Sequence, residues 1–151
     1  GSGNAGACHA YRIVGSHATS APIAGTAATN SIGSPNTTPD PPSVTASWGV
    51  EDNLYLVAAI ASADGNTTTG YPANYSNGTA TYCSGTVCAI GTATRELASG
   101  SDKPGTFTTI VDDVWVAQTV VVRPAGITII PTAVRVIGGG VGQRFIGIGG
   151  N

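Results

Sequence analysis

Side chains that could act in nucleophilic catalysis are few in this chain. His9 and His17 are its two histidines, and a triad needs one of them beside a nucleophile and an acidic group. Cys8 and His9 are neighbours in an alternating segment, so in a strand their side chains would point to opposite faces and could not pair. The sequence also contains no G-x-S-x-G nucleophile elbow. We therefore expect that the protein is not an enzyme.

Acidic residues suggest two further kinds of chemistry, glycoside hydrolysis by paired carboxylates and calcium binding by clustered oxygens. The Asp64-Gly65-Asn66 segment lacks the repeated spacing and the terminal Glu of a calcium loop. Acidic residues in turns more often accept hydrogen bonds from turn amides, and we expect that role here, with no metal and no cofactor. We also expect Arg95 and Glu96 to form a local polar contact. The acidic residues considered are Glu51, Asp52, Asp64, Glu96, Asp112 and Asp113.

The three cysteines are Cys8, Cys83 and Cys88. The last two flank a short, turn-prone segment and can close a small disulfide loop. The alternative is that all three are reduced thiols buried as small apolar side chains. A structural zinc site would need four ligands. Cys8 has no evident partner in the sequence.

Two groups of residues could carry or contact sugars. Asparagines in N-x-[ST] sequences are potential glycosylation sites. Tyrosines in a turn-rich region could form a platform for a carbohydrate, because sugar C–H faces suit aromatic rings; the alternative is that these rings pack over the edge of the domain. The asparagines are Asn36, Asn66, Asn74 and Asn77, and the tyrosines are Tyr71, Tyr75 and Tyr82.

The composition indicates one domain with an uncharged polar surface. The chain has 151 residues, of which 9% are charged and 41% hydrophobic, with 22 glycines and a net charge of −2. Its single lysine and scattered arginines form no basic patch, so we expect no nucleic-acid partner. No apolar run reaches the roughly 20 residues of a membrane-spanning helix. Because methionine is absent, we expect the chain to be processed or to be part of a longer product.

The alternation of apolar and polar residues predicts an all-β fold. No stretch shows amphipathic helical spacing. Residues 114–123 give the strongest strand signal, and because both of their faces are mostly apolar we expect a strand buried inside a sandwich. The predicted strands are 7–14, 54–61, 87–96, 106–111 and 114–123, with shorter β-prone runs at 127–130, 134–137 and 145–148.

Two stretches are predicted to lie outside the sheets. Residues 15–47 are rich in proline, threonine and serine, and proline cannot donate to a ladder, so we expect a long extended arm. Residues 65–85 are rich in glycine, asparagine and threonine and predict turns. We expect a β-sandwich over residues 1–124 and a glycine-rich tail over residues 125–151.

Several short motifs, in their order and spacing, carry a resemblance. They are SWG at 47–49, DNL at 52–54, the DG turn at 64–65, YPANY at 71–75, GTATREL at 91–97, PGTF at 104–107 and the run from Trp115 to Pro124. Residues 7–124 resemble a β-sandwich domain that recurs in virion proteins of tailed bacteriophages and in environmental phage and bacterial surface proteins. The resemblance implies placement on a particle or surface, and no particular chemistry. In similar proteins several strands precede the segment that matches residues 10–12, so the resemblance also implies that this domain lacks some N-terminal strands or receives them from another chain.

Together these observations predict an antiparallel β-sandwich of jelly-roll type that serves as a non-catalytic structural subunit. We expect a phage decoration or tail protein on an extracellular particle, whose partners are copies of itself and other particle subunits. Two alternatives are a subunit of a secreted, glycosylated filament and a carbohydrate-binding module that contacts cell-surface glycans.

A lone β segment leaves unpaired backbone groups, so we expect the tail to add a strand to a neighbouring subunit. The apolar tail residues are Ile129, Ile130, Phe145, Ile146 and Ile148.

Overall fold

The computed structural model describes residues 7–17, 23–29, 34–62, 66–82 and 88–125. All regular elements within these ranges are strands, and all pairings between them are antiparallel, which confirms the predicted all-β class. The strands are β1 (Ile23–Thr29), β2 (Val44–Thr45), β3 (Asp52–Ala61), β4 (Thr68–Gly70), β5 (Ser76–Tyr82), β6 (Ala89–Ala98), β7 (Ser101–Asp102), β8 (Thr108–Thr109) and β9 (Trp115–Val122).

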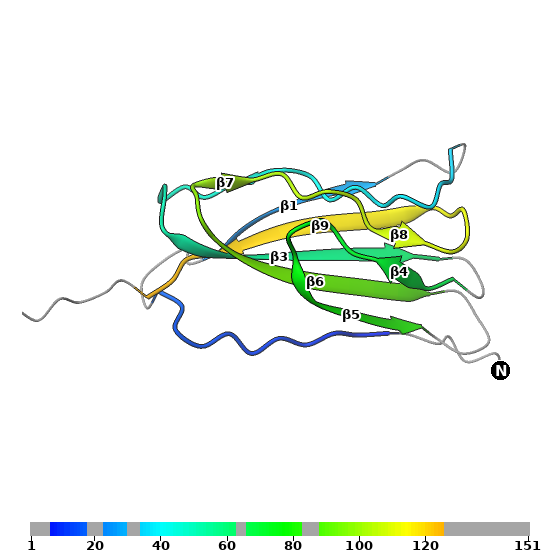
Figure 1. Ribbon diagram of the computed structural model, residues 1–151, viewed down its shortest axis with the longest axis horizontal. Coiled ribbons are helices and arrows are strands. Elements are labelled where there is room, and N and C mark those ends of the chain that lie inside the picture. The colour runs from blue at the N-terminus through cyan, green and yellow to red at the C-terminus, as the bar shows by residue number, and fades with distance from the viewer. Residues whose placement is uncertain (1–6, 18–22, 30–33, 63–65, 83–87, 126–151) are drawn as a thin grey trace, which may run out of the picture.

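Five strands form one continuous sheet in the order β1-β9-β3-β6-β5 (Figure 1). β3 lies at the centre and pairs with β6 from Asp52↔Ala98 to Ala61↔Ala89, and with β9 from Leu54↔Val122 to Ala61↔Trp115. These three strands contain more than half of the valines, isoleucines and leucines of the described chain, and such side chains suit a pleated, buried surface. They confirm the strands predicted near 54–61, 87–96 and 114–123.

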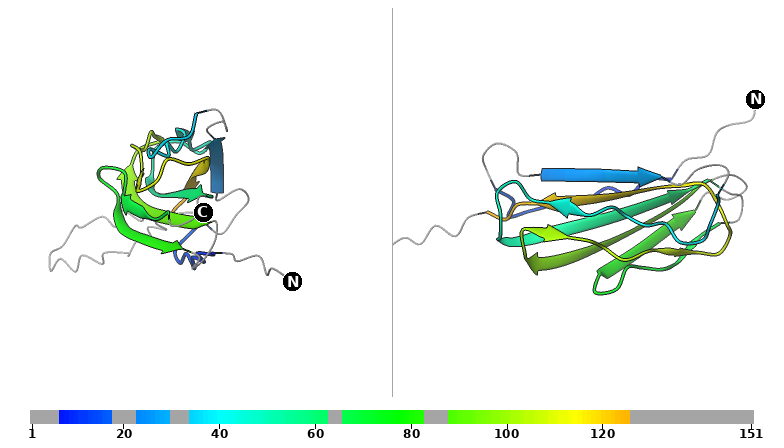
Figure 2. Two further views of the ribbon diagram at one scale, coloured as in Figure 1. Left: turned by 90° about the vertical axis from the view of Figure 1, so that its right-hand side faces the viewer. Right: turned by 90° about the horizontal axis from the view of Figure 1, so that it is seen from above.

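Short strands and loops cover one face of this sheet, which we call the inner face. The β2–β7 and β4–β8 pairs each form a two-stranded sheet, and they lie on the same side of the large sheet as their connecting loops (Figures 1 and 2). The layers approach closely at Gly91, where a Cβ atom would lie 2.4 Å from Thr68 Oγ1. Glycine at this position therefore permits the second layer to pack on β6. The arrangement is that of a sandwich with one regular and one irregular layer.

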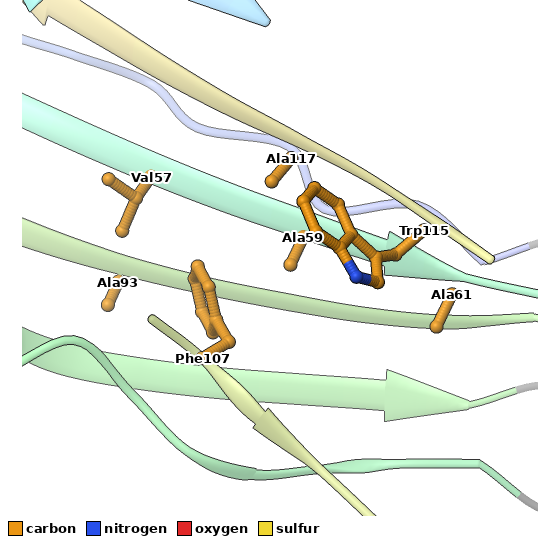
Figure 3. Packing of buried hydrophobic residues seen from close by; sticks show 7 residues of the cluster. All are labelled: Val57, Ala59, Ala61, Ala93, Phe107, Trp115 and Ala117. Atoms are coloured by element: carbon orange, nitrogen blue, oxygen red, sulfur yellow. The ribbon is translucent and has the colours of Figure 1, made fainter. Parts of the chain in front are cut away.

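The hydrophobic core fills the space between the two layers. Small side chains of the large sheet leave room for two large rings, Phe107 from the second layer and Trp115 from β9, which lie among the alanines in Figure 3. A second cluster surrounds Tyr55 and Val121 nearer the β2–β7 pair. The first cluster contains Val57, Ala59, Ala61, Ala93, Phe107, Trp115 and Ala117, and the second contains Val44, Ala46, Tyr55 and Val121.

The predicted extended arm at 15–47 is wrong in part, because β1 lies within it and joins the large sheet. Residues Ile23–Thr29 contain no proline, so every residue of the strand has an N–H to donate. The later prolines also have a structural role, since Pro39 and Pro41 are buried. The Pro39 carbonyl accepts a hydrogen bond from Phe107 N at 2.8 Å. The proline-rich stretch therefore supplies an edge strand and part of the second layer.

Two other sequence-based assignments differ from the structure. Residues 7–14 are extended but form no strand, and the nearest ladder contact among the described residues is the bridge between Ser16 and Pro124. The region predicted as turns at 65–85 contains β4 and β5. Serine, threonine, asparagine and glycine are poor strand formers, and the tertiary pairing of β5 with β6 outweighs that preference. The runs at 127–130, 134–137 and 145–148 lie outside the described residues.

Candidate interaction surface

A polar cluster under the inner face fixes the second layer to the large sheet. Asp102 of β7 accepts a hydrogen bond from the Tyr75 hydroxyl at 2.6 Å and an ion pair from Arg95 Nη1 at 3.2 Å. Only 8% of the Asp102 side chain is exposed, so this pair is shielded from water and screening salt. Burial, reinforced by the Asp102 contact, raises the pKa of Tyr75 well above its usual range. The cluster holds the layers together.

A second set of hydrogen bonds closes the same face at the start of β3. The buried Asn53 side chain accepts from Trp48 Nε1 at 2.8 Å and donates to the Ser99 carbonyl at 2.7 Å. The Tyr55 hydroxyl donates to that same carbonyl at 2.7 Å. Burial raises the pKa of Tyr55 above its ordinary value. Within the described residues, no buried side-chain nitrogen or oxygen on this face lacks a partner.

Two of the acidic residues in described turns, Asp113 and Glu51, accept hydrogen bonds or form ion pairs. Asp113 Oδ1 accepts hydrogen bonds from Val114 N at 2.6 Å and from the Ser62 hydroxyl at 3.1 Å. Glu51 pairs with Arg123 at 2.7 Å, and this hydrogen bond lowers the pKa of Glu51. The Glu51–Arg123 pair joins the turn that precedes β3 to the end of β9, and the Ser62–Asp113 hydrogen bond joins the end of β3 to the turn that precedes β9.

The prediction that Arg95 and Glu96 contact each other is wrong. Arg95 points to the inner face and pairs with Asp102, whereas Glu96 lines a groove on the opposite face of the sheet. Successive side chains of a strand point to opposite faces, and both residues lie within β6. Their adjacency in the sequence therefore keeps them apart.

His9 attaches the N-terminal segment, residues 7–17, to the large sheet. His9 Nδ1 lies 2.8 Å from Thr92 Oγ1, and His9 Nε2 lies 2.9 Å from Thr81 Oγ1. The Tyr11 hydroxyl also contacts Thr92. Because Thr92 is buried, its hydroxyl is not offered to a substrate. The described residues contain no group of three His, Cys, Asp or Glu side chains that could hold a metal ion.

The tyrosines proposed as a glycan platform lie in different environments. The rings of Tyr71 and Tyr75 pack against the hydrophobic clusters, and Tyr71 makes an edge contact with Phe107 at a centroid distance of 6.0 Å. Tyr71 also lies directly over Gly78, where a Cβ atom would be 2.6 Å from the ring. Tyr82 is exposed at the far end of β5. Replacing Tyr71 or Tyr75 would therefore damage the core, whatever its effect on a ligand.

The four candidate glycosylation sites are not equivalent in the fold. Asn66 is only 2% exposed, and its amide both donates to and accepts from the backbone of Val111. A glycan at Asn66 is incompatible with this packing. Asn36 Oδ1 accepts from Trp115 Nε1 at 3.0 Å. Asn74 and Asn77 are exposed and have positive φ angles of 67° and 53°.

The remaining predicted residues are cysteines and tail positions. Cys88 is disulfide-bonded, and Cys8 is a free, exposed thiol. Cys83 lies outside the described residues. The tail residues Ile129, Ile130, Phe145, Ile146 and Ile148 also lie outside them.

Sequence reasoning missed the most unusual surface, which lies on the side of the large sheet opposite the second layer. We call this side the outer face. The register places Ile60 beside Val116, Ala58 beside Gln118, and Leu56 beside Val120. Ile60 and Val116 are 46% and 44% exposed, and the other aliphatic residues are only half-buried. We call this surface the outer patch, and it consists of Leu56, Ala58, Ile60, Val116 and Val120.

The outer patch corrects the expectation that both faces of residues 114–123 are buried. On β9 the inner side chains are buried, whereas Val116 and Gln118 are exposed and Val120 is half-buried. The sequence of residues 114–123 indicates that both faces of the strand are mostly apolar. It does not indicate whether the chain itself covers both faces. Contiguous apolar surface on a folded protein indicates an interaction site.

The N-terminal segment covers the other half of the outer face, toward β5. Residues 7–17 run along the β5 side of the sheet (Figure 1), and together with β3, β5 and β6 they border an open groove of about 650 Å³. Polar side chains from β5 and β6, such as Asn77, Thr94 and Glu96, line this groove. The outer face is thus polar and partly covered over β5 and β6, and apolar and open over β3 and β9.

No helix among the described residues is long and apolar enough to cross a membrane. Comparison of the chain with protein-family models, with curated proteins and with solved structures gave no match.

Proposed function

We propose that this protein is a non-catalytic structural subunit of an extracellular assembly, a decoration or tail protein of a phage virion that associates with copies of itself through β-strand contacts. The resemblance of residues 7–124 to virion β-sandwich domains supports the proposal that the particle is a phage virion. The surface chemistry supports self-association.

The outer patch is the observation that carries this proposal. Its aliphatic side chains come from two adjacent central strands, and they surround the exposed amide of Gln118, which lies between Val116 and Val120 on β9. Burial of apolar surface releases about 25 cal/mol per Å², so a partner that covers this patch gains free energy without pairing any charge. A subunit that repeats in a particle can use such a surface at every copy.

The low charge of the chain is consistent with packing many copies side by side. The net charge is −2 in 151 residues, so electrostatic repulsion between neighbouring subunits is small. The outer patch itself includes no ionisable residue. Association through this surface is therefore expected to depend weakly on salt, in contrast to nucleic-acid binding.

The proposal is tested by measuring the size and shape of the full chain in solution. We expect light scattering after size-exclusion chromatography to show concentration-dependent oligomers, and negative-stain electron microscopy to show particles of regular shape. Removing residues 125–151 should abolish assembly and leave the far-ultraviolet circular dichroism of the sandwich unchanged. A monomer at every concentration, or unchanged particles without the tail, would overturn the proposal.

A subunit of a secreted, glycosylated filament is the second candidate. It is favoured by the placement of Asn74 and Asn77 in exposed positions of positive φ, where an attached sugar would meet no core residue. Intact mass of the protein from its natural source separates the candidates: added hexose masses favour the filament, and an unmodified mass in a phage particle favours the virion subunit.

A further inference from the structure

The two edges of the large sheet differ in how open they are to a further strand. β1 and β5 are its outermost strands. Among the described residues, neither strand has a ladder partner on its outer side. An outer strand leaves a row of backbone N–H and C=O groups unpaired, which is a template for another strand unless the edge is blocked.

The β5 edge carries two features that block strand addition. Its register with β6 shifts between Ser76 and Thr79, and Asn77 has a φ of 53°. A shift of this kind bends a strand and interrupts its row of hydrogen-bonding groups. In addition, the N-terminal segment is held beside this strand by the contact of His9 with Thr81. A further strand would have to displace that segment.

The β1 edge carries none of these features. All seven of its residues pair with β9 without a shift, from Ile23↔Val122 to Thr29↔Val116. The strand contains no proline and no charged residue, and none of its residues has a positive φ. Gly25, Thr26 and Ala27 are exposed. Proteins usually protect such an edge with charge, proline or a bulge.

The β1 edge also borders the outer patch. Gly25 is opposite Val120, and Ala27 is opposite Gln118, so the β1 residues on the outer face are small and neutral where they meet β9. A strand added beside β1 would extend the outer face by one row. Its alternate side chains could then lie against this apolar surface.

From this asymmetry we infer that β1 accepts an added strand from the tail of a second copy, formed by residues 144–148. The inference rests on the proposed function and names its acceptor and donor. The donor sequence Arg144-Phe145-Ile146-Gly147-Ile148 contains three apolar residues that favour strands, the phenylalanine and the two isoleucines. Addition of one chain's segment to another's sheet edge is an established mode of recognition.

The length of the tail allows this contact between separate copies. The described chain ends at Ala125, and an extended chain spans about 3.3 Å per residue. The connection from Ala125 to residue 144 can therefore reach up to roughly 60 Å. Because the donor and the acceptor are different surfaces, the contact is heterologous and repeats from copy to copy, giving a ring or a filament.

Disulfide trapping tests the proposed pairing directly. All variants carry Cys8→Ser, so that no other free thiol competes. Chains with Ala27→Cys are mixed with isotope-labelled chains that carry one cysteine at Phe145, Ile146, Gly147 or Ile148, and the mixture is oxidised. Residues opposite each other in a ladder have Cα atoms about 4.5–5.5 Å apart, within the range of a disulfide. We expect labelled–unlabelled dimers at alternate tail positions.

The matched control places the cysteine on the other edge, as Thr79→Cys, and should give at least tenfold less of the mixed dimer. The inference is overturned if no tail position crosslinks to residue 27, if Thr79→Cys crosslinks equally well, or if a chain carrying both cysteines crosslinks only within itself.

A second pair of variants separates this inference from the proposed function. Ala27→Lys places a charge on the β1 edge and should weaken self-association at least tenfold, whereas Thr79→Lys on β5 should leave it unchanged. If both variants self-associate as strongly as the wild type, the assignment of β1 as the acceptor is overturned, whereas self-association itself still holds. A wild-type chain that is monomeric at every concentration would overturn both.

Discussion

The inner and outer faces of the large sheet are formed by the same strands but differ in how far the rest of the chain buries them. On β3, Tyr55 and Val57 are fully buried on the inner face, whereas Leu56 and Ile60 on the outer face are half-buried or exposed. The chain's own second layer covers the inner face. Nothing among the described residues covers the apolar half of the outer face, and this is the surface on which the proposed self-association depends.

Polar groups show the same contrast. Beneath the inner face, Asp102, Tyr75 and Asn53 form hydrogen bonds that join the second layer to the sheet. The outer patch is formed by aliphatic side chains, and the exposed Gln118 amide lies among them. Burial there adds mainly apolar contact, and the Gln118 amide needs a hydrogen bond if a partner covers it.

The largest expected effect is on the inner core. Phe107→Ala should lower the free energy of unfolding by about 3–5 kcal/mol, because it leaves a cavity between the layers. Ile60→Ala on the outer face should lower it by only about 1 kcal/mol or less, because that side chain is already half in water. Urea denaturation of dilute protein measures both. Equal losses would contradict the distinction between the two faces.

The next largest effect is on the hydrogen bonds of buried polar side chains in the second layer. Asn66→Ala removes the partner of the Val111 backbone and leaves a buried group unsatisfied, so it should destabilise the protein by about 1–3 kcal/mol. The control, Asn74→Gly, changes an exposed asparagine of positive φ and should alter stability little. A neutral result for Asn66→Ala would show that this asparagine does not hold the layer.

Alkaline pH should weaken the inner face. Burial raises the pKa of Tyr75 and Tyr55 in the folded state, so the unfolded chain loses these protons first. The contribution of these tyrosines is fully present below the ordinary tyrosine pKa of about 10 and is lost as pH rises above it. Unfolding experiments between pH 8 and 11 should show this decline, and Tyr75→Phe should reduce its slope. An unchanged slope would exclude Tyr75 as its source.

The smallest expected effect is at the partly buried ion pair between Glu51 and Arg123. The hydrogen bond from Arg123 lowers the pKa of Glu51. Its contribution is therefore present above the ordinary glutamate pKa and is lost as pH falls through the lowered value. Glu51→Gln should remove this part of the acid dependence, with little effect at neutral pH. Acid titrations that superimpose for both proteins would contradict this role.

The parts of the fold that the sequence predicted are those with strong local patterns. The apolar run at 54–61 and the β-branched run at 114–123 indicated β3 and β9, because β-branched residues favour strands wherever they occur. β1 was missed because the composition of residues 15–47 concealed a proline-free stretch of seven residues. β5 was missed because its residues favour turns and depend on β6 for pairing.

The candidate surface was harder to predict than the fold. The alternation in residues 114–123 showed two apolar faces, but whether each face is covered depends on where residues 34–48 and 99–111 pack, which is tertiary information. The tyrosines at 71 and 75 illustrate the same point, since their sequence context indicated exposed loops and their rings contact the core. Local patterns determine which residues share a face, and packing determines which face remains open.

Self-association through the outer patch is the central claim, and sedimentation velocity of two matched valine variants tests it most directly. Val116→Asp places a charge in the outer patch, and Val50→Asp places the same charge on a turn, where Val50 is 73% exposed. We predict that the wild type and Val50→Asp form the same oligomers and that Val116→Asp sediments as a folded monomer. Oligomers of Val116→Asp equal to those of the wild type would contradict the claim.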